Sequence, residues 1–456
     1  MTRTTVELGP GALWLGLALL GLGCTEEPTA PPVEPPTNVI LVVVDTLRAD
    51  HLGCYGYPRD TSPRLDALAR DAVVFTKVRS QSSCTFASVN SMLTSRYTAR
   101  FLGQPDGRMG IPSEVPTIAR ILTDHGFDTA AVSASPIVRA TPSDSNPHGG
   151  FDAGFRIFDE QCLWKPAECV NAAARRVIGE LDSPFFLYLH YMDPHDPYRP
   201  PGSFGRRFAD DYSGFDFIAR GDPNPIEEMI YGSGATVDID ERDIGQLVDL
   251  YDDEIAYFDE RFGELLDWLA ADALLDETMV IVASDHGEEF LEHGHIKHCR
   301  TVFDSSTHTP LIISVPGVAA HRPVEAAVEN LDIVPTILDY VGLDAPDGGV
   351  QGRSLRPLME GRAIPADFVF SLQYPWASVD DGRRKLISNL TRTDHRLYDL
   401  ATDPSETSNL AAADPETVGR LRAVLAPWLA REVDALAGRT GLEESIAQLE
   451  ALGYLR

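Results

Sequence analysis

Two short apolar runs, separated by more than two hundred residues, constrain the fold of this chain most strongly. Residues 39–44 are aliphatic and precede Asp45, and residues 279–283 are apolar and precede Ser284 and Asp285. Neither run alternates with polar residues, so both suit strands that are buried on two faces. Open parallel sheets place their ligand crevices at the carboxyl ends of strands. The two aspartates are therefore predicted to meet at one edge of a central sheet.

The residues at these strand ends are typical metal ligands. His286 follows Asp285 directly, and Glu288 lies two residues further on. Ionised carboxylates at a buried sheet edge need a partner, and a divalent cation can be shared by several oxygens and one imidazole. An aspartate at a strand end can instead cap the following turn. This alternative stays open, and it is stronger for Asp45 than for Asp285.

Strand and helix patterns alternate along most of the chain. They predict an α/β fold over residues 38–350, with a mainly parallel sheet sandwiched by helices. Short strands followed by helices then predict a small α+β C-terminal subdomain over residues 351–456. Ser62 is expected to cap a helix that begins at Pro63. Strands are expected at 129–134, 185–192, 368–372, 385–388 and 396–400, and helices at 117–125, 247–269, 415–436 and 442–452.

Four longer motifs occur in a fixed order. They lie at residues 45–57 (DTLRADHLGCYGY), 91–97 (SMLTSRY), 285–294 (DHGEEFLEHG) and 397–404 (LYDLATDP). Together they resemble the sulfatase family of the alkaline-phosphatase superfamily, over residues 38 to 410. The resemblance implies an alkaline-phosphatase-like fold. It also implies a metal-dependent hydrolase that cleaves sulfate esters, or related phosphate or phosphonate esters, by in-line attack of a metal-bound nucleophile.

The position of the family's nucleophile falls on Thr85. Sulfatases that use formylglycine make it from a Cys or Ser that lies two residues before a Pro and four before an Arg. Neither Thr85 nor Cys84 has a proline and an arginine at those places, so formylglycine is not expected. An unmodified Thr85 hydroxyl is the predicted nucleophile, activated by direct coordination to a cation. Cys84 is the alternative, if the loop shifts by one residue.

The nucleophile also bears on the substrate. The ester that forms on a threonine nucleophile must be broken by attack at its central phosphorus or sulfur atom. This route is familiar for phosphoryl groups, so Thr85 favours phosphate or phosphonate esters over sulfate esters. The arrangement resembles superfamily members with a threonine nucleophile, including phosphoglycerol transferases. A phosphoryl or phosphoglycerol-type transferase and a catalytically inactive, anion-binding relative are therefore the alternatives. A purely structural role as a lipoprotein would not explain why potential metal ligands stand at the positions of the family's ligands.

The resemblance implies one divalent metal ion held by Asp45, Thr85, Asp285 and His286. Three oxygens and one imidazole favour Mn or Zn, whereas Ca normally takes more oxygen ligands; Ca and Mg stay open. Thr46 stands where many sulfatases carry a second Asp, which further disfavours calcium.

Four more residues resemble substrate contacts of the family. His195 lies in a proline-flanked loop after the strand at 185–192, and it is expected to bind the ester oxygens or to protonate the leaving group. Lys297, His298 and His308 stand where the family contacts substrate oxygens. His195 can equally be a plain structural residue.

The amino terminus resembles a bacterial export signal. Residues 12–23 are apolar, too few to span a bilayer comfortably, and precede Cys24. This predicts a lipoprotein signal peptide over residues 1–24, although cleavage by an ordinary signal peptidase stays open because Gly21 stands where Leu is usual. Residues 25–37 are expected to form a proline-rich tether. The expected location is the cell envelope, facing the periplasm or the cell surface, with membrane contact only through the lipid.

Charge and cysteine content narrow the choice of partners. The formal net charge of −31 argues against a nucleic-acid partner, so a small sulfate- or phosphate-ester substrate is the expected ligand. Six cysteines are too few for a disulfide scaffold. Cys162 and Cys169 are close enough to pair, but spacing alone does not establish the bond.

Overall fold

The computed structural model describes residues 34–434, apart from 98–110, 112–114, 147–148, 165, 210, 233–237, 319–322 and 347–348. The predicted signal peptide with Cys24, the tether up to residue 33 and the helix at 442–452 lie outside the described residues. Within the described part, we find no helix with the length and apolar character that a bilayer crossing requires.

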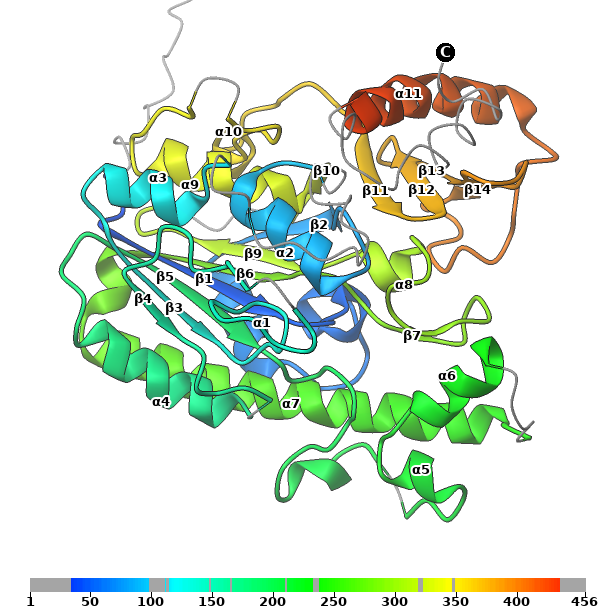
Figure 1. Cartoon of the computed structure of the whole chain (residues 1–456), viewed down its shortest axis with the longest axis horizontal. Coiled ribbons are helices and arrows are strands. Elements are labelled where there is room, and N and C mark those ends of the chain that lie inside the picture. The colour runs from blue at the N-terminus through cyan, green and yellow to red at the C-terminus, as the bar shows by residue number, and fades with distance from the viewer. Residues whose placement is uncertain are drawn as a thin grey trace, which may run out of the picture. The chain divides into compact units, whose positions relative to one another are not determined.

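An eight-stranded sheet forms the main layer, in the strand order β10-β2-β9-β6-β1-β5-β3-β4 (Figure 1). β9 runs antiparallel to β2 and β6, whereas the other neighbouring strands are parallel. The predicted mainly parallel sheet is confirmed. Its strands are β1 (Asn38–Val44), β2 (Val73–Arg79), β3 (Asp128–Ser133), β4 (Ile157–Asp159), β5 (Phe185–Tyr191), β6 (Thr278–Ser284), β9 (Leu311–Ser314) and β10 (Val324–Glu329).

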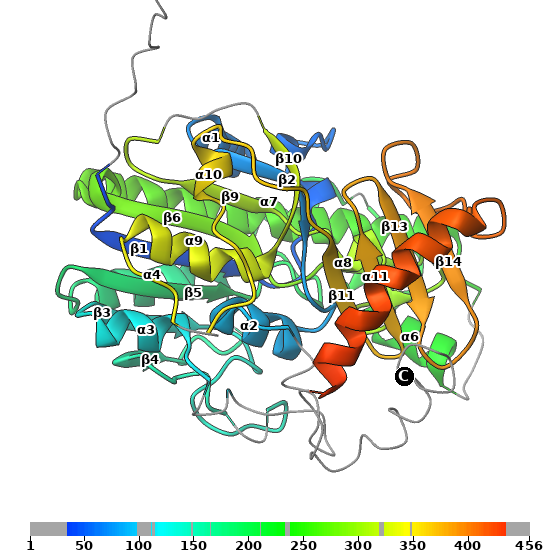
Figure 2. The same ribbon diagram turned by 90° about the horizontal axis from the view of Figure 1, so that it is seen from above.

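Helices cover both faces of this sheet (Figures 1 and 2). One face packs against α1 (Pro63–Arg70), α4 (Ala167–Ile178) and α7 (Glu241–Ala271), and the other against α2 (Thr85–Thr94), α3 (Ile118–Asp124), α9 (Ile333–Tyr340) and α10 (Arg356–Met359). β1 contributes to both apolar cores, with Ile40 and Val42 on one face and Leu41 and Val43 on the other. This explains why the strand shows no polar alternation.

The cap of α1 differs from the sequence prediction. The Ser62 side chain makes no capping hydrogen bond. Instead, the Asp259 carboxylate on α7 accepts hydrogen bonds from the backbone N–H groups of Arg64 and Leu65, at 2.9 and 2.8 Å. The prediction that Ser62 caps the helix is wrong, because the orphan N–H groups find a carboxylate on a packed neighbouring helix.

A four-stranded antiparallel sheet and one helix form the predicted α+β C-terminal subdomain (Figure 2). Its elements are β11 (Val369–Gln373), β12 (Trp376–Asp380), β13 (Arg384–Asn389), β14 (His395–Asp399) and α11 (Pro415–Asp434). Trp428 and Leu425 of α11 pack in the apolar core of this sheet. The subdomain joins the main sheet through β11, where the Leu372 N–H donates to the Gln81 carbonyl at 2.9 Å. The division at residue 350 stays a prediction.

The connections contain short elements. They are α5 (Asp216–Ala219), α6 (Asn224–Tyr231), α8 (Asp304–Thr307), the hairpin of β7 (Glu289–Phe290) and β8 (Ile296–Lys297), and the 3-10 turns at Ala49–His51, Gly53–Tyr55, Phe204–Arg206, Leu274–Glu277 and Asn330–Asp332. Cys162 and Cys169 form a disulfide just before and within α4, the pairing that their spacing allowed.

Candidate active site

Asp45 and Asp285 lie side by side at the carboxyl ends of two parallel strands. β1 and β6 pair in a register that places Val44 opposite Ser284, so the next residue on each strand is an aspartate. Both carboxylates are almost completely buried, with 1% or less of each residue exposed. The sheet therefore brings together two acids that are far apart in the sequence.

His286 and Thr85 complete this cluster. One ligand atom from each of Asp45, Asp285 and His286 lies within 4.8 Å of the other two. His286 Nε2 lies 3.8 Å from Asp45 Oδ1, 3.6 Å from Asp285 Oδ2 and 3.1 Å from Thr85 Oγ1. We call Asp45, Thr85, Asp285 and His286 the Thr85 group.

The donor set of the Thr85 group fits a divalent cation. Asp45 Oδ1 and Asp285 Oδ2 are buried and accept no hydrogen bond, an arrangement that is costly unless a cation satisfies both oxygens. His286 Nδ1 donates to the Gly287 carbonyl at 2.9 Å. Because a carbonyl can only accept, Nε2 carries the lone pair that faces the carboxylates, as in most metal-binding histidines.

The pKa shifts of the two carboxylates also fit a bound cation. Burial would raise the pKa of Asp45, but the hydrogen bond to His190 and the charges of His195 and His286 lower it below the ordinary value. Burial and the charge of Asp45 raise the pKa of Asp285. Only one of the two acids is readily ionised by itself, since like charges at short range oppose each other. A shared cation would remove this conflict.

Thr85 occupies the first turn of a buried helix. It is the first residue of α2, and every residue of that helix is buried. Ser88 Oγ donates to the Asp285 carbonyl at 2.5 Å, which ties the first turn of α2 to the end of β6. A helix amino terminus carries a partial positive charge that favours nearby anions. This position suits a nucleophile that attacks an anionic ester.

The alternative nucleophile, Cys84, is excluded by a disulfide. Its sulfur is bonded to that of Cys299, so it has no thiol for attack, and this alternative is wrong. The Cys299 N–H also donates to the Ser83 carbonyl at 2.8 Å. The segment before Thr85 is therefore joined, covalently and by a hydrogen bond, to the segment that follows His298.

His195 and His298 lie next to the Thr85 group. The His298 ring centroid is 4.7 Å from that of His286 and 5.0 Å from that of His195. Burial would lower the pKa of His195, but Asp196 and Asp45 raise it above the ordinary value. Burial and the two neighbouring imidazoles lower the pKa of His298 well below its ordinary value. The structure thus brings both predicted histidines to the site with different charge preferences.

Lys297 is connected to the site through Asp196. Its Nζ lies 3.4 Å from Asp196 Oδ2 and 3.2 Å from Glu227 Oε2, and it donates to Asn224 Oδ1 at 2.8 Å. These partners fix the ammonium group beside Asp196. It can therefore orient that carboxylate and balance its charge.

His308 lies away from the Thr85 group. Its Nε2 donates to the Thr76 carbonyl at 2.9 Å, and its backbone pairs with Arg79 at the end of β2. The ring lines a separate cavity of about 480 Å³. Burial and Arg79 lower its pKa to about 4. The predicted substrate contact finds no support, because pairing with β2 turns this ring toward that strand.

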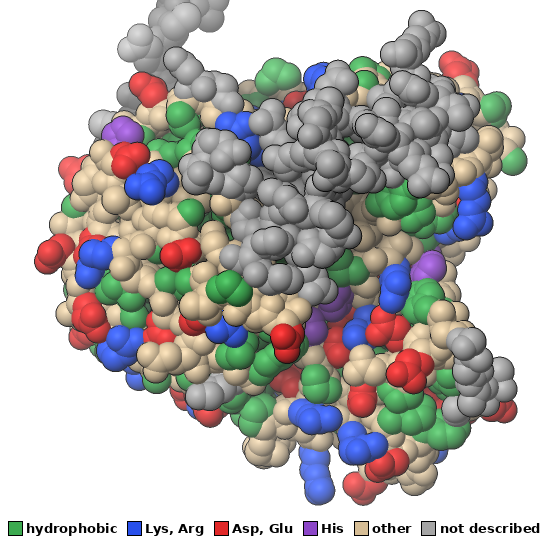
Figure 3. Space-filling model, viewed as in Figure 1, with side chains coloured by type: hydrophobic (Ala, Val, Ile, Leu, Met, Phe, Trp, Pro, Cys, Tyr) green, Lys and Arg blue, Asp and Glu red, His purple; other side chains and the backbone are tan. Residues whose placement is uncertain are grey.

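A second cavity, of about 380 Å³, adjoins His195. Trp164 lies at its edge, 52% exposed, with its ring centroid 5.4 Å from that of His195. Figure 3 shows histidine side chains together with acidic and basic ones in a hollow of this face. The other lining residues are Pro166, Met192, Asp193, Asp196, Pro197, Arg199, Pro201 and Glu254. This cavity can hold the group that an ester carries on its leaving oxygen.

Comparison with known families shows the family of the chain. The family model described as Sulfatase matches residues 37–343, which is more than half of the chain. The chain belongs to the sulfatase family. A second model, described as the C-terminal region of N-sulphoglucosamine sulphohydrolase, matches residues 291–427 and covers the C-terminal sheet of this sulfatase-family protein.

Individual members of the sulfatase family are distant from this chain. Choline-sulfatase of Rhizobium meliloti is 27% identical over 270 residues, 56% of this chain and 51% of that protein. Arylsulfatase K of Bos taurus is 29% identical over 293 residues, 57% of this chain and 54% of that protein. The matched region thus spans about half the length of these relatives. A phosphonate monoester hydrolase from Silicibacter pomeroyi shares the fold, with a TM-score of 0.68, 22% identity, and coverage of 89% of this chain and 97% of that chain.

Two acids at this site were not among the predicted metal ligands and substrate contacts. Asp196 follows His195, and its carboxylate lies among the site histidines. Glu288 is fully buried and pairs with His298 Nδ1 at 3.0 Å. Asp196 directly follows His195, and Glu288 stands within the motif at residues 285–294, so their placement near histidines was the available signal. Contacts across distant loops were needed to assign them.

Proposed function

We propose that this sulfatase-family chain is an exported, metal-dependent hydrolase of sulfate, phosphonate or phosphate esters, with Thr85 as its nucleophile. The observation that supports this most strongly is the convergence of the Thr85 group. Two carboxylates, an imidazole and a hydroxyl from β1, β6 and α2 meet in one buried space. A structural role alone does not explain two buried carboxylate oxygens without partners.

The Thr85 group would hold one divalent cation, with Mn or Zn favoured by its mixture of oxygen and nitrogen ligands. When bound, such a cation would stabilise negative charge on the ester oxygens and favour the alkoxide form of a coordinated hydroxyl. All four residues are buried. Burial lowers the effective dielectric constant around them and so strengthens each charge interaction in the site.

The residues of the chain define a two-step reaction. Thr85 Oγ1 forms a bond to the central phosphorus or sulfur while the bond to the ester oxygen breaks, and the departing oxygen takes up a proton and leaves as an alcohol. A water molecule then attacks the same central atom and releases Thr85 with inorganic phosphate, phosphonate or sulfate. His195 and His298 lie beside the Thr85 group and are placed to stabilise the departing oxygen.

The choice between phosphorus and sulfur rests on Thr85. Formylglycine expels sulfate by collapsing to an aldehyde, and this route is closed to an unmodified threonine. We therefore favour phosphonate and phosphate esters, although the relatives named choline-sulfatase and arylsulfatase K point to sulfate esters. Likeness to a phosphonate monoester hydrolase is a likeness of fold. An acceptor alcohol in place of water would make the same site a transferase.

A substrate panel tests the proposal. The full chain, loaded with Mn(II), is assayed on nitrophenyl sulfate, nitrophenyl phosphate, a nitrophenyl phosphodiester and a nitrophenyl phosphonate. We expect turnover of at least one phosphorus ester, its loss after chelation, and its recovery when Mn(II) is added back. Asp285→Asn should lose both bound metal and activity. His125→Ala, an exposed histidine at the end of α3, is the matched control and should keep both.

Two outcomes contradict the proposal. Full metal binding without turnover of any ester would leave an inactive, anion-binding member of the family. Turnover that survives complete removal of the metal would contradict metal dependence.

Export is tested separately. In a bacterial host that processes lipoproteins, the chain should enter the membrane fraction, and Cys24→Ser should release it. Unchanged fractionation of that variant would contradict the lipid anchor.

A further inference from the structure

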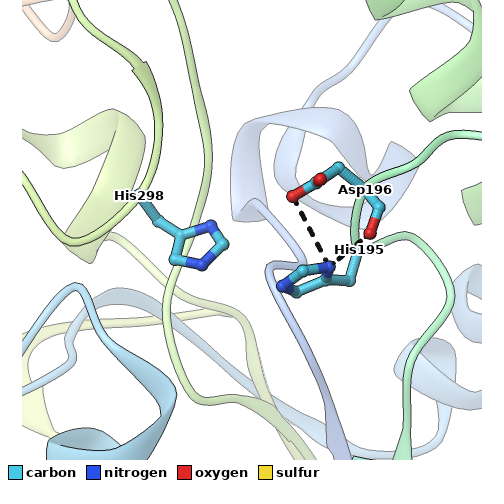
Figure 4. A group of neighbouring side chains, drawn as sticks. All are labelled: His195, Asp196 and His298. Carbon is cyan, nitrogen blue, oxygen red and sulfur yellow. Dashed lines mark hydrogen bonds and ion pairs between the residues drawn. The ribbon is translucent and has the colours of Figure 1, made fainter. Parts of the chain in front are cut away.

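A second cluster of metal-ligating side chains lies next to the Thr85 group. His195, Asp196 and His298 each offer one ligand atom within 4.8 Å of the other two. His195 and Asp196 follow β5, whereas His298 follows β8. Figure 4 shows the two rings and the carboxylate directed into one space. We call these three residues the His195 group.

Hydrogen bonds leave one nitrogen free on each of the two histidines. His195 Nδ1 donates to the Asp196 carbonyl oxygen at 2.7 Å, and His298 Nδ1 pairs with Glu288 Oε1 at 3.0 Å. The carbonyl can only accept, which favours the His195 tautomer with the lone pair on Nε2, and the pairing of His298 Nδ1 leaves Nε2 of that ring for a ligand. The Tyr198 hydroxyl donates to Glu288 Oε2 at 3.2 Å and so fixes that carboxylate. Metal-binding histidines usually have such partners on their outer nitrogen.

Asp196 has a buried carboxylate oxygen that accepts no hydrogen bond from the described residues. The residue is 5% exposed. Its Oδ1 accepts no hydrogen bond, although His195 Nδ1 lies 3.6 Å away, and its Oδ2 pairs with Lys297 Nζ at 3.4 Å. A buried carboxylate oxygen without a partner is costly. A cation between the two rings would satisfy it.

The charges around both clusters favour a second cation. Asp45, Asp285, Asp196 and Glu288 are all buried at this site, and Lys297 Nζ lies 3.4 Å from Asp196 Oδ2. A cation at the Thr85 group would pair with Asp45 and Asp285 and would leave Asp196 Oδ1 without a partner. A second divalent cation would make the pocket attractive to an anion.

We propose that the His195 group binds a second divalent cation, next to the cation assigned to the Thr85 group. Two imidazoles and one carboxylate suit Zn or Mn. Three protein ligands leave a position for water or for the departing ester oxygen. A pair of cations can stabilise both the attacking and the leaving oxygen. This inference rests on the proposed function and adds to it a means of neutralising the leaving oxygen.

Metal counting tests the second site. The full chain is stripped with chelator, dialysed against excess Mn(II), and analysed for manganese per chain. We expect two Mn(II) in the unaltered chain, one in Asp196→Asn and one in His298→Ala, with folding checked by circular dichroism. His125→Ala should retain two. Electron paramagnetic resonance should show spin coupling between adjacent Mn(II) ions in the unaltered chain and none in Asp196→Asn.

The possible results separate this inference from the proposed function. One Mn(II) in the unaltered chain, kept by Asp196→Asn and His298→Ala but lost by Asp285→Asn, would overturn the second site and leave the Thr85 site intact. Two Mn(II) without spin coupling would also overturn it, since the ions would not be neighbours. No bound Mn(II) in any form would contradict both proposals.

Discussion

Thr85 is the side chain on which the proposed chemistry depends most. Thr85→Ala removes the hydroxyl that we propose as the nucleophile, so kcat/KM should fall by at least about 10³-fold. Thr85→Ser keeps a hydroxyl at the start of α2 and should retain measurable turnover. Steady-state kinetics on the best ester of the panel, with circular dichroism as a check of folding, would measure both. An alanine variant with the original rate would refute the assignment.

Individual side chains were predicted unevenly from the sequence. The Thr85 group could be named because strand ends and family motifs fix its backbone positions. The ring of His308 could not be placed, since its direction depends on pairing with β2. The disulfide of Cys84 with Cys299 was also invisible, because it joins loops 215 residues apart in the sequence. Side-chain direction in loops is a tertiary property that spacing does not encode.

The disulfide between the loops before α2 and after β8 is expected to position the proposed nucleophile, Thr85. It joins the residue before Thr85 to the residue after His298. Removing it by Cys84→Ala and Cys299→Ala together should lower kcat by roughly 10-fold to 10²-fold, because small displacements of reacting groups are costly. Cys54→Ala, at the one free cysteine among the described residues, is the control. Equal rates in the double variant and the control, below their melting temperatures, would show that the bond has no positioning role.

The contact between α1 and α7 predicts a pH dependence. Burial raises the pKa of Asp259 to about 7, although the N–H groups of Arg64 and Leu65 oppose the shift. A carboxyl with a raised pKa in the folded state takes up its proton there first. Its contribution to stability is therefore present at low pH and is lost as pH rises through about 7.

This pH dependence can be isolated with one variant. Asp259→Asn cannot titrate at this position. When the pH is lowered from about 8 to about 5, the free energy of unfolding of the natural chain should therefore rise relative to that of the variant, by on the order of 2 kcal/mol. Urea unfolding at several pH values would measure the difference. A difference that stays constant with pH would contradict the raised pKa.

Helices and strands were predicted better than their ends and partners. The long helix expected at 247–269 is the middle of α7, and the runs before Asp45 and Asp285 are buried strands. Their periodicity is strong because one or both faces are buried. β12 was missed, since Trp376–Asp380 is a short strand at a hairpin. The antiparallel direction of β9 depends on which strands lie beside it, and the sequence does not show the order of strands in the sheet.

At the scale of the whole molecule, buried ion pairs link the eight-stranded sheet and α8 to the four-stranded C-terminal sheet. Arg79 at the end of β2 pairs with Asp304 and with Asp380 of β12, at 2.8 and 3.2 Å. Lys385 of β13 is fully buried and pairs with Asp304 and Glu406, at 2.6 and 3.0 Å. These contacts join the main sheet to the C-terminal subdomain. The family model that matches residues 291–427 crosses this same junction.

Removing Lys385 should therefore weaken the junction. Lys385→Met leaves Glu406 buried without a cationic partner and Asp304 with Arg79 alone, and we expect a loss of about 3–5 kcal/mol in the free energy of unfolding. Chemical denaturation would measure it. Arg383→Met removes an exposed arginine that pairs with Asp399 and should change stability little. Equal stability of the two variants would show that the buried pairs are not needed to hold the subdomain.

X-ray diffraction from crystals soaked in Mn(II), recorded at the manganese absorption edge, tests the central claim most directly. The account predicts an anomalous peak bonded to the Asp45, Asp285 and His286 side chains and to Thr85 Oγ1. The second inference predicts a neighbouring peak at the His195 group. Manganese peaks that all lie elsewhere, with Asp45 and Asp285 still facing an empty space, would contradict the account.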